Sequence, residues 1–288
     1  MNAYLKEMRI HHYIKNILVL VPLICSGQFF DWARLYDGII GVIAFCLLSS
    51  SIYFINDIAD VESDRAHPVK KNRPIASGAI PIKKAYLTTA LLVAAAFFVN
   101  ILIFNTLATI LFASYLILNI AYSYGLKNYP LIDLIVLVTG FVLRIAYGSV
   151  ITDIAISNWL YLATFTIAFY LGMGKRRNEL AKNNEDCHNS TRPVLKYYSA
   201  EFLDKNMYMC LALANVYYAL WCVDPATVSL YGNNIIFTVP IAILITMRYS
   251  MDIECNNYGD PVDTVVHDYP LFALCGIFFL TLFLLLYI

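Results

Sequence analysis

The chain has 288 residues, of which 60% are hydrophobic and 14% are charged, against about 25% charged in an ordinary soluble domain. This composition argues against a soluble globular protein, because so apolar a chain cannot cover its surface with polar groups. Its 20 lysines and arginines balance 20 aspartates and glutamates. A net charge of zero leaves no excess of positive charge for a phosphate backbone, so we expect no nucleic-acid partner.

Apolar stretches long enough to cross a bilayer follow one another along the chain, since a membrane helix needs about 20 such residues. The polar, aromatic-rich stretch 4–13 before them predicts an interfacial lead-in helix. Backbone groups in lipid must be satisfied within their own segment. We therefore expect an all-α, polytopic helical bundle that forms a single membrane domain over residues 1–288, with about nine transmembrane helices. The predicted spans are 14–30, 36–55, 82–104, 106–124, 131–150, 159–174, 207–223, 235–249 and 269–288.

Almost all of the positive charge gathers on one side of this predicted bundle. The N-terminus and the loops after the second, fourth, sixth and eighth spans hold 18 of the 20 lysines and arginines, whereas the opposite loops hold Arg34 alone and Arg144 lies within the fifth span. The positive-inside rule then predicts a cytoplasmic N-terminus and an outer C-terminus. We expect an integral protein of the bacterial inner membrane, with its active site on the cytoplasmic side.

An acidic stretch ends the second predicted span. On a helix turning by about 100° per residue, Asp57, Asp60 and Asp64 fall within about 60° of arc, with Asn56 beside them and Glu62 turned away. Three carboxylates on one face repel each other unless a cation lies among them, and an all-oxygen set favours Mg²⁺ or Mn²⁺ with a phosphorylated substrate. We predict the three aspartates as catalytic residues and, together with Asn56, as ligands of Mg²⁺. The alternative is a solvated helix end rich in acids.

A basic run follows over residues 65–74. Acids for a metal and cations for free phosphate oxygens neutralise different parts of a diphosphate, so Arg65, Lys70 and Arg73 are predicted to bind substrate. His67 lies in the same run and is a further candidate, although a loop histidine beside a proline is about as often structural. Topology alone would also put positive charge in this loop.

Residues 56–78, with the motif NDxxDxxxD and the sequence Asp-Arg-Ala-His-Pro, resemble the UbiA superfamily of membrane prenyltransferases. Segments 12–16, 122–144, 174–180, 198–204 and 248–261 are similar to the decaprenyl-phosphate phosphoribosyltransferase group within it. The resemblance implies that the acids bind a Mg²⁺-diphosphate. It also adds further candidates for substrate binding. Four of these are cations near predicted helix ends, and their alternative role is contact with lipid headgroups. The candidates are Lys15, Asn16, Tyr122, Lys127, Lys175, Arg176 and Glu179.

One departure separates the chain from ordinary prenyltransferases, which carry a second DxxxD motif after the sixth span. This chain has Gly-Lys-Arg-Arg-Asn-Glu at 174–179. Three cations and one acid suit a ligand with more phosphate than a metal can neutralise. The expected partners are thus phosphoribosyl diphosphate and a polyprenyl phosphate, and the expected reaction is Mg²⁺-dependent phosphoribosyl transfer with release of diphosphate.

Arg144 is a candidate of a different kind. It follows Asp133 by eleven residues, about 16 Å deeper on nearly the same helix face. A charge at that depth must face the bundle interior and be paired, which makes it a candidate for substrate binding. A structural pair with a buried acid or carbonyl is the alternative.

Two other functions stay open. Prenyl transfer to an aromatic acceptor would use the same Mg²⁺ face. A non-enzymatic lipid-phosphate carrier or transporter would usually show internal repeats and interrupted helices near the midplane, which we do not find clearly. Membrane lipids surround the bundle in each case, and formation of a homo-oligomer is left open.

Overall fold

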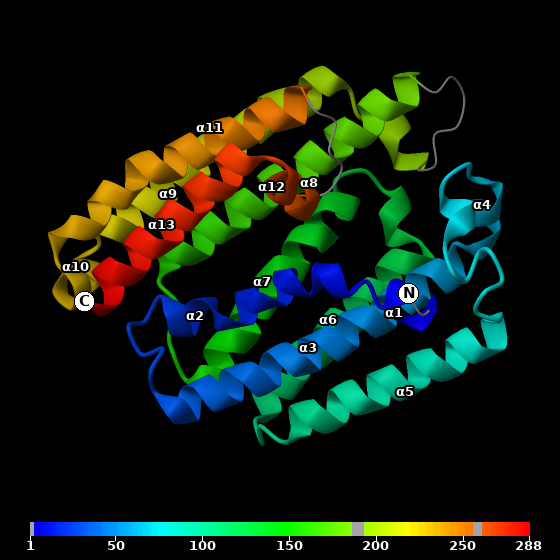
Figure 1. Cartoon of the computed structure of the whole chain (residues 1–288), viewed down its shortest axis with the longest axis horizontal. Helices are drawn as coiled ribbons and strands as arrows, with labels where there is room; N and C mark the ends of the chain where they lie inside the picture. Colours follow the sequence, from blue (N-terminus) through cyan, green and yellow to red (C-terminus); the bar gives the residue numbers. More distant parts are fainter. Residues whose placement is uncertain (1–2, 186–192, 256–260) are drawn as a thin grey trace. The chain divides into compact units, whose positions relative to one another are not determined.

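The computed structural model describes residues 3–185, 193–255 and 261–288 (Figure 1). Helices are its only regular elements over these ranges, which confirms the predicted all-α class. The chain divides into two compact units, Met1–Ala155 and Ile156–Ile288. The single domain expected from the sequence stays a prediction.

The first unit is built around one long helix, α3 (Trp32–Ala59), which packs against most of the other elements of the unit. Asp31 begins it by accepting hydrogen bonds from the backbone N–H groups of Ala33 and Arg34, which satisfies donors that a helix start leaves free. The other elements of the unit are α1 (Ala3–Glu7), η1 (Ile10–Leu20), α2 (Val21–Ile24), α4 (Val61–Ala66), η2 (Lys70–Asn72), α5 (Ile82–Ile101), α6 (Thr106–Tyr124), η3 (Leu126–Asn128) and α7 (Ile132–Thr152).

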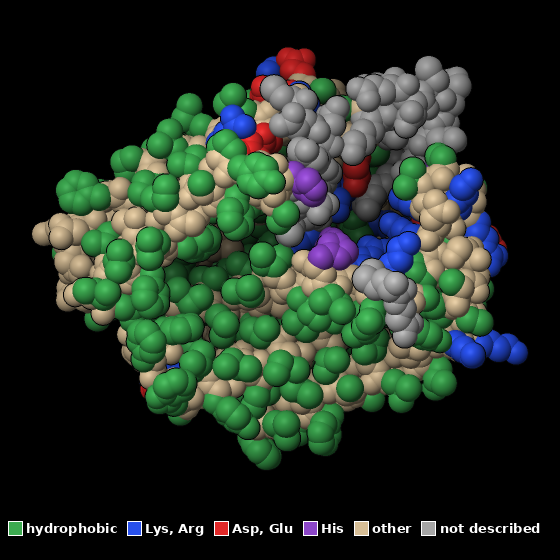
Figure 2. Space-filling model, viewed as in Figure 1, with side chains coloured by type: hydrophobic (Ala, Val, Ile, Leu, Met, Phe, Trp, Pro, Cys, Tyr) green, Lys and Arg blue, Asp and Glu red, His purple; other side chains and the backbone are tan. Residues whose placement is uncertain are grey.

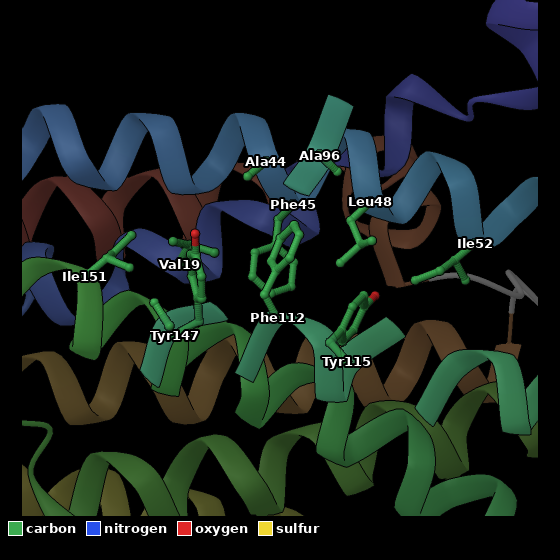
Figure 3. Packing of buried hydrophobic residues seen from close by; sticks show 11 residues of the cluster. Val19, Ala44, Phe45, Leu48, Ile52, Ala96, Phe112, Tyr115, Tyr147 and Ile151 are labelled. Carbon is green, nitrogen blue, oxygen red and sulfur yellow. The ribbon is translucent and has the colours of Figure 1, made fainter. Parts of the chain in front are cut away.

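Aromatic side chains fill the centre of this unit (Figure 3). The ring of Phe45 on α3 lies 5.1 Å from Phe112 and 5.2 Å from Tyr115, both on α6, and 4.9 Å from Tyr147 on α7. Each aromatic pair at such a distance stabilises the fold by about 0.5–1.5 kcal/mol, in addition to the contribution of the apolar surface it buries. The apolar core therefore fixes α3 against α6 and α7, and with them the end of α3 that carries the acidic motif.

The segment η1 crosses α7 at a glycine. A Cβ atom at Gly148 would lie 1.9 Å from the carbonyl oxygen of Val19, far inside van der Waals contact, so only glycine permits this approach. On α3, a Cβ atom at Gly41 would meet the side chains of Ile151 and Tyr147 at 2.4 and 2.9 Å. Small residues thus let η1, α3 and α7 pack closely, as is usual between membrane helices.

The second unit is built on two long neighbours, α8 (Asn158–Glu185) and α9 (Ala200–Val223), which pack along each other. Ser199 caps α9 and Asp268 caps α13, each by accepting a backbone N–H. The remaining elements are η4 (Pro193–Tyr197), α10 (Pro225–Tyr231), η5 (Asn233–Thr238), α11 (Val239–Cys255), α12 (Pro261–His267) and α13 (Tyr269–Tyr287).

Seven segments in the described ranges are long and apolar enough to cross a membrane: α3, α5, α6, α7, α9, η5 with α11, and α13. The predicted count of nine is not confirmed. The first apolar run forms only the shorter segment Ile10–Ile24, and the sixth predicted span lies within the longer helix α8. Figure 2 shows hydrophobic side chains over the visible face of α3 and α5, with lysines and arginines gathered beside α4. An apolar outer surface of this kind suits contact with lipid.

The predicted lead-in helix over 4–13 is interrupted. The helix α1 ends at Glu7, and Arg9 has a left-handed backbone with φ 51° and ψ 52° before η1 begins at Ile10. A non-glycine residue in this region is strained. The break redirects the chain so that the side chain of Arg9 reaches α3.

Candidate active site

The acidic motif lies across the junction of α3 and α4 and does not form one continuous helix. The helix α3 ends at Ala59, and Asp60 separates it from α4 with φ −96° and ψ 5°. The backbone N–H of Asp60 still donates to Asn56 at 2.9 Å, and that of Asp64 donates to Asp60 at 2.8 Å. The helical spacing of four residues therefore continues through the break, and the predicted common face is retained.

Side-chain contacts join the four predicted metal ligands into one cluster. The Asn56 amide lies 3.4 Å from Asp57 Oδ1 and 3.4 Å from Asp60 Oδ2. Arg73 links the other pair, since its Nη1 donates to Asp57 Oδ1 at 3.1 Å and to Asp64 Oδ2 at 2.7 Å. Asp57 and Asp64 are buried, with 1% and 2% of their surface exposed. Burial raises the pKa of Asp64 from its ordinary value, and the Arg73 guanidinium opposes this rise.

Two further cations complete the charge balance of this cluster. Arg9 Nη2 lies 2.8 Å from both carboxylate oxygens of Asp57, and its guanidinium stands over the ring of Tyr53 at 4.7 Å. Lys127, in η3, forms an ion pair with Asp60. Three separate segments thus bring positive charge to the acids, because buried carboxylates must be paired to remain ionised.

The sequence prediction included Arg73 and Lys127 but missed two members of this cluster, Arg9 and Glu7. In the sequence, Arg9 contributed only to the excess of positive charge on one side of the bundle. Its position just before the first apolar run was the one feature that could have marked it as a site residue. Glu7 gave no signal, because its place beside Asp57 depends on the chain reversal at Arg9.

The donor chemistry of the cluster fits Mg²⁺, since Asn56, Asp57, Asp60 and Asp64 offer oxygen ligands alone. Within the described residues, no group of three or more His, Cys, Asp or Glu side chains is arranged to hold a metal ion. Each aspartate of the motif contacts a lysine or arginine instead. The Arg73 guanidinium already holds a positive charge between Asp57 and Asp64, which is where a cation is most stabilised.

The loop after α4 is fixed by contacts within itself. Arg65 Nε donates to the carbonyl oxygen of Ala76 at 3.1 Å. The Nδ1 atom of His67 accepts the backbone N–H groups of Val69 at 3.0 Å and Lys70 at 3.4 Å. Burial and the charge of Lys70 lower the pKa of His67. By accepting these two backbone N–H groups, the imidazole shapes the loop.

Asn16 and Arg144 meet in a separate buried network. Arg144 Nε donates to Asn16 Oδ1 at 2.9 Å, Nη1 to the carbonyl oxygen of Gly140 at 2.8 Å, and Nη2 to the hydroxyl of Tyr115 at 2.6 Å. Asn16 in turn donates to Ser49 on α3 at 3.1 Å. Each guanidinium nitrogen thus has a protein acceptor, as the rule for intramembrane charges requires.

The remaining candidates of the first unit, Lys15 and Tyr122, are both half-buried. Lys15 Nζ lies 3.3 Å from His12 Nδ1, and Tyr122 is in the last turn of α6.

In the second unit, Lys175, Arg176 and Glu179 all lie on α8. Arg176 is fully buried, and its Nη1 lies 3.0 Å from Glu179 Oε2. Arg177 Nε pairs with Asp204 on α9 at 2.9 Å. Arg177 therefore links α8 to α9, whereas the ion pair of Arg176 lies within α8.

Known proteins resemble the chain over nearly its whole length. A family model described as the UbiA prenyltransferase family matches residues 17–257. The chain is 32% identical to the decaprenyl-phosphate phosphoribosyltransferase of Mycolicibacterium smegmatis, over 93% of this chain and 87% of that protein. It is 30% identical to the protein of the same name from Corynebacterium glutamicum, over 93% and 81%.

The fold agrees with these matches. A solved UbiA homolog from Archaeoglobus fulgidus, bound to GPP and Mg²⁺, superposes with a TM-score of 0.72 at 18% identity and covers 99% of both chains. With seven apolar helices of membrane-spanning length, the chain is an integral membrane protein and a transferase. It belongs to the UbiA prenyltransferase family, as its acidic motif indicated.

Proposed function

We propose that this protein transfers the 5-phosphoribosyl group of phosphoribosyl diphosphate to a polyprenyl phosphate and releases diphosphate. The observation that carries the proposal is the cluster at the α3–α4 junction, in which three aspartates and three cations alternate. A diphosphate needs both kinds of group, because acids hold its metal and cations neutralise its free oxygens. The names of the two bacterial relatives support the same reaction.

In the proposed reaction, the bond between C1 of ribose and the diphosphate oxygen breaks, and an oxygen of the lipid phosphate bonds to C1. Negative charge grows on the leaving diphosphate, and Mg²⁺ bound by Asn56, Asp57, Asp60 and Asp64 would supply charge neutralisation there. The acceptor phosphate is ionised at neutral pH, so no general base is required. His67 holds the loop by accepting two backbone N–H groups, so we assign it no proton transfer in this reaction.

The cations have a second role in this proposal. Arg73 and Lys127 neutralise the aspartates in the present structure. When acids hold Mg²⁺ instead, the same side chains become available to the phosphate oxygens. Within the first unit, the 5-phosphate and the lipid phosphate are left for Lys15 and Lys70. Asn16 and Arg144 take a structural role, because they contact each other and other protein groups.

The topology belongs to the same proposal. The excess of lysine and arginine on one side supports a cytoplasmic N-terminus and an outer C-terminus in the bacterial inner membrane. The phosphorylated donor is water-soluble and the acceptor is membrane-bound, so the active site would lie at the cytoplasmic membrane surface. The oligomeric state plays no part in the chemistry.

The test is incubation of the purified chain with Mg²⁺, labelled phosphoribosyl diphosphate and a polyprenyl phosphate. We expect label to pass into the organic extract, in proportion to the acceptor added. Lack of lipid-linked label with acceptors of several chain lengths, together with turnover of a prenyl diphosphate and an aromatic acid, would replace the proposal by prenyl transfer.

The roles of the acids are tested by substitution. Asp60→Asn should abolish transfer while the thermal midpoint changes little, because the half-exposed ion pair with Lys127 contributes at most about 1 kcal/mol. Glu62→Gln is the matched control, since this acid in the same stretch is exposed and should leave the rate unchanged. An Asp60→Asn protein with the wild-type rate would remove the metal assignment.

A further inference from the structure

Glu7, the last residue of α1, is a buried carboxylate with no counter-ion of its own. Only 1% of its surface is exposed, and neither of its carboxylate oxygens has a hydrogen-bond partner among the described residues. Burial of an unpaired polar group is costly, and natural proteins keep such groups mainly where a ligand or an ion uses them. The position therefore calls for a functional explanation.

The surroundings of Glu7 are those of the acidic cluster. Burial and the neighbouring Asp57 carboxylate raise the pKa of Glu7 to about 8, while the charges of Arg9 and Arg73 oppose the rise. Both arginines make their ion pairs with Asp57. Two carboxyl groups are thus packed together in a buried place, and the positive charge supplied by the protein goes to one of them.

The backbone holds Glu7 in this place at a cost. Arg9, two residues further on, has a strained left-handed conformation, and this reversal lets Arg9 bind both oxygens of Asp57. The same reversal sets the end of α1 against α3. Strain of this kind persists where the surrounding structure requires it, and it is frequent at functional sites.

We propose that Glu7 is a further ligand of the divalent cation held by the Asp57 cluster, supplied by the N-terminal helix α1. A buried carboxyl group beside Asp57 that makes no ion pair among the described residues offers an oxygen donor of the type that Mg²⁺ and Mn²⁺ prefer. A dipositive ion can also replace the proton that Glu7 holds beside Asp57, so that both acids bind the ion in their ionised form. This inference rests on the proposed function and extends its metal site to a residue outside the NDxxDxxxD motif.

The experiment measures Mn²⁺ binding to the full-length purified chain in detergent, without substrate, from the electron paramagnetic resonance signal of free Mn²⁺. Glu7→Gln should weaken Mn²⁺ binding by about tenfold or more. Glu62→Gln should bind Mn²⁺ as the wild type does. Without metal, Glu7→Gln should melt at or above the wild-type temperature, because the amide, unlike the carboxyl group, can never carry a second negative charge beside Asp57.

A merely structural Glu7 gives the opposite pattern, namely a lower metal-free midpoint with unchanged Mn²⁺ affinity, and this would overturn the proposal. If Glu7→Gln does not fold, Glu7→Asp decides the question. This variant keeps the carboxylate but shortens its reach, so it should bind Mn²⁺ more weakly than the wild type, and equal affinity would overturn the proposal.

The two proposals fail in different ways. Wild-type protein that binds Mn²⁺ through Glu7 but transfers no ribosyl label refutes the proposed function alone. Wild-type protein that transfers label while Glu7→Gln binds Mn²⁺ normally refutes the role of Glu7 alone. Wild-type protein that binds no Mn²⁺ refutes both the metal site and the role of Glu7.

Discussion

Arg144 forms hydrogen bonds that join three helical segments of the first unit. Its replacement by glutamine tests whether its role is to stabilise the packing of these segments. The guanidinium reaches Asn16 in η1, Tyr115 on α6 and the carbonyl oxygen of Gly140 on its own helix α7. It also stands over the Tyr115 ring at 4.7 Å. Glutamine is shorter and uncharged, so it cannot make these contacts together.

The expected loss follows from the contacts. Hydrogen bonds between membrane helices contribute about 0.6 kcal/mol each on average and up to about 1.7. A desolvated cation–π contact adds about 1–2 kcal/mol. The guanidinium also stands over Phe45, at the longer distance of 5.7 Å. With three hydrogen bonds and the nearer ring contact as the main terms, and some contact retained by the amide, Arg144→Gln should lower the free energy of unfolding by about 2–4 kcal/mol.

The assay is thermal unfolding of the purified protein in detergent, without substrate. At about 2–4 °C per kcal/mol for a large domain, the midpoint should fall by roughly 4–16 °C. Arg34→Gln is the matched control. Its guanidinium contacts Asp31 and a backbone carbonyl at the exposed start of α3, so its midpoint should change by less than about 2 °C.

An unchanged midpoint for Arg144→Gln would refute the structural role. If the same variant then lost affinity for phosphoribosyl diphosphate, Arg144 would be a substrate ligand, as one of the two sequence hypotheses had it. A lowered midpoint with normal substrate affinity is the result that the contacts predict.

Three more outcomes follow from the packing and the charges. Gly148→Ala should prevent normal expression or lower the thermal midpoint strongly, because its Cβ would meet the Val19 carbonyl, whereas Gly276→Ala, where nothing lies within 4 Å, should melt like the wild type. Without metal, the stability of the wild type should fall as pH rises from 4.5 to about 8, because the folded chain holds a proton on Glu7 that the unfolded chain releases. In a pH series of thermal midpoints, Glu7→Gln should show a smaller fall than the wild type. An equal slope in the two proteins would contradict the reasoning. His67→Ala should lower the midpoint by a few degrees through loss of two backbone contacts and leave the pH profile of transfer unchanged, since the imidazole carries no proton in the proposed reaction.

The sequence by itself determined the all-helical membrane class, most of the spans and the place of the acidic motif. These features depend on local quantities, namely hydropathy over about 20 residues and helical spacing over four. The spacing held even across the helix break at Asp60, because the backbone bonds of four-residue reach continue there. Pairing of Arg144 was also predictable, since an unpaired charge at that depth is excluded on energetic grounds.

Only the tertiary structure decided which groups meet. Asn16 and Arg144 are 128 residues apart and Arg9 and Asp57 are 48 apart, so no local pattern could pair them. The place of Glu7 at the end of α1 depends on the left-handed turn at Arg9, which hydropathy does not register. The first apolar segment is short at its other end, because α2 ends at Ile24. From the sequence one can infer only that a buried charge must have a partner. Which partner it has depends on the packing of helices from distant parts of the chain.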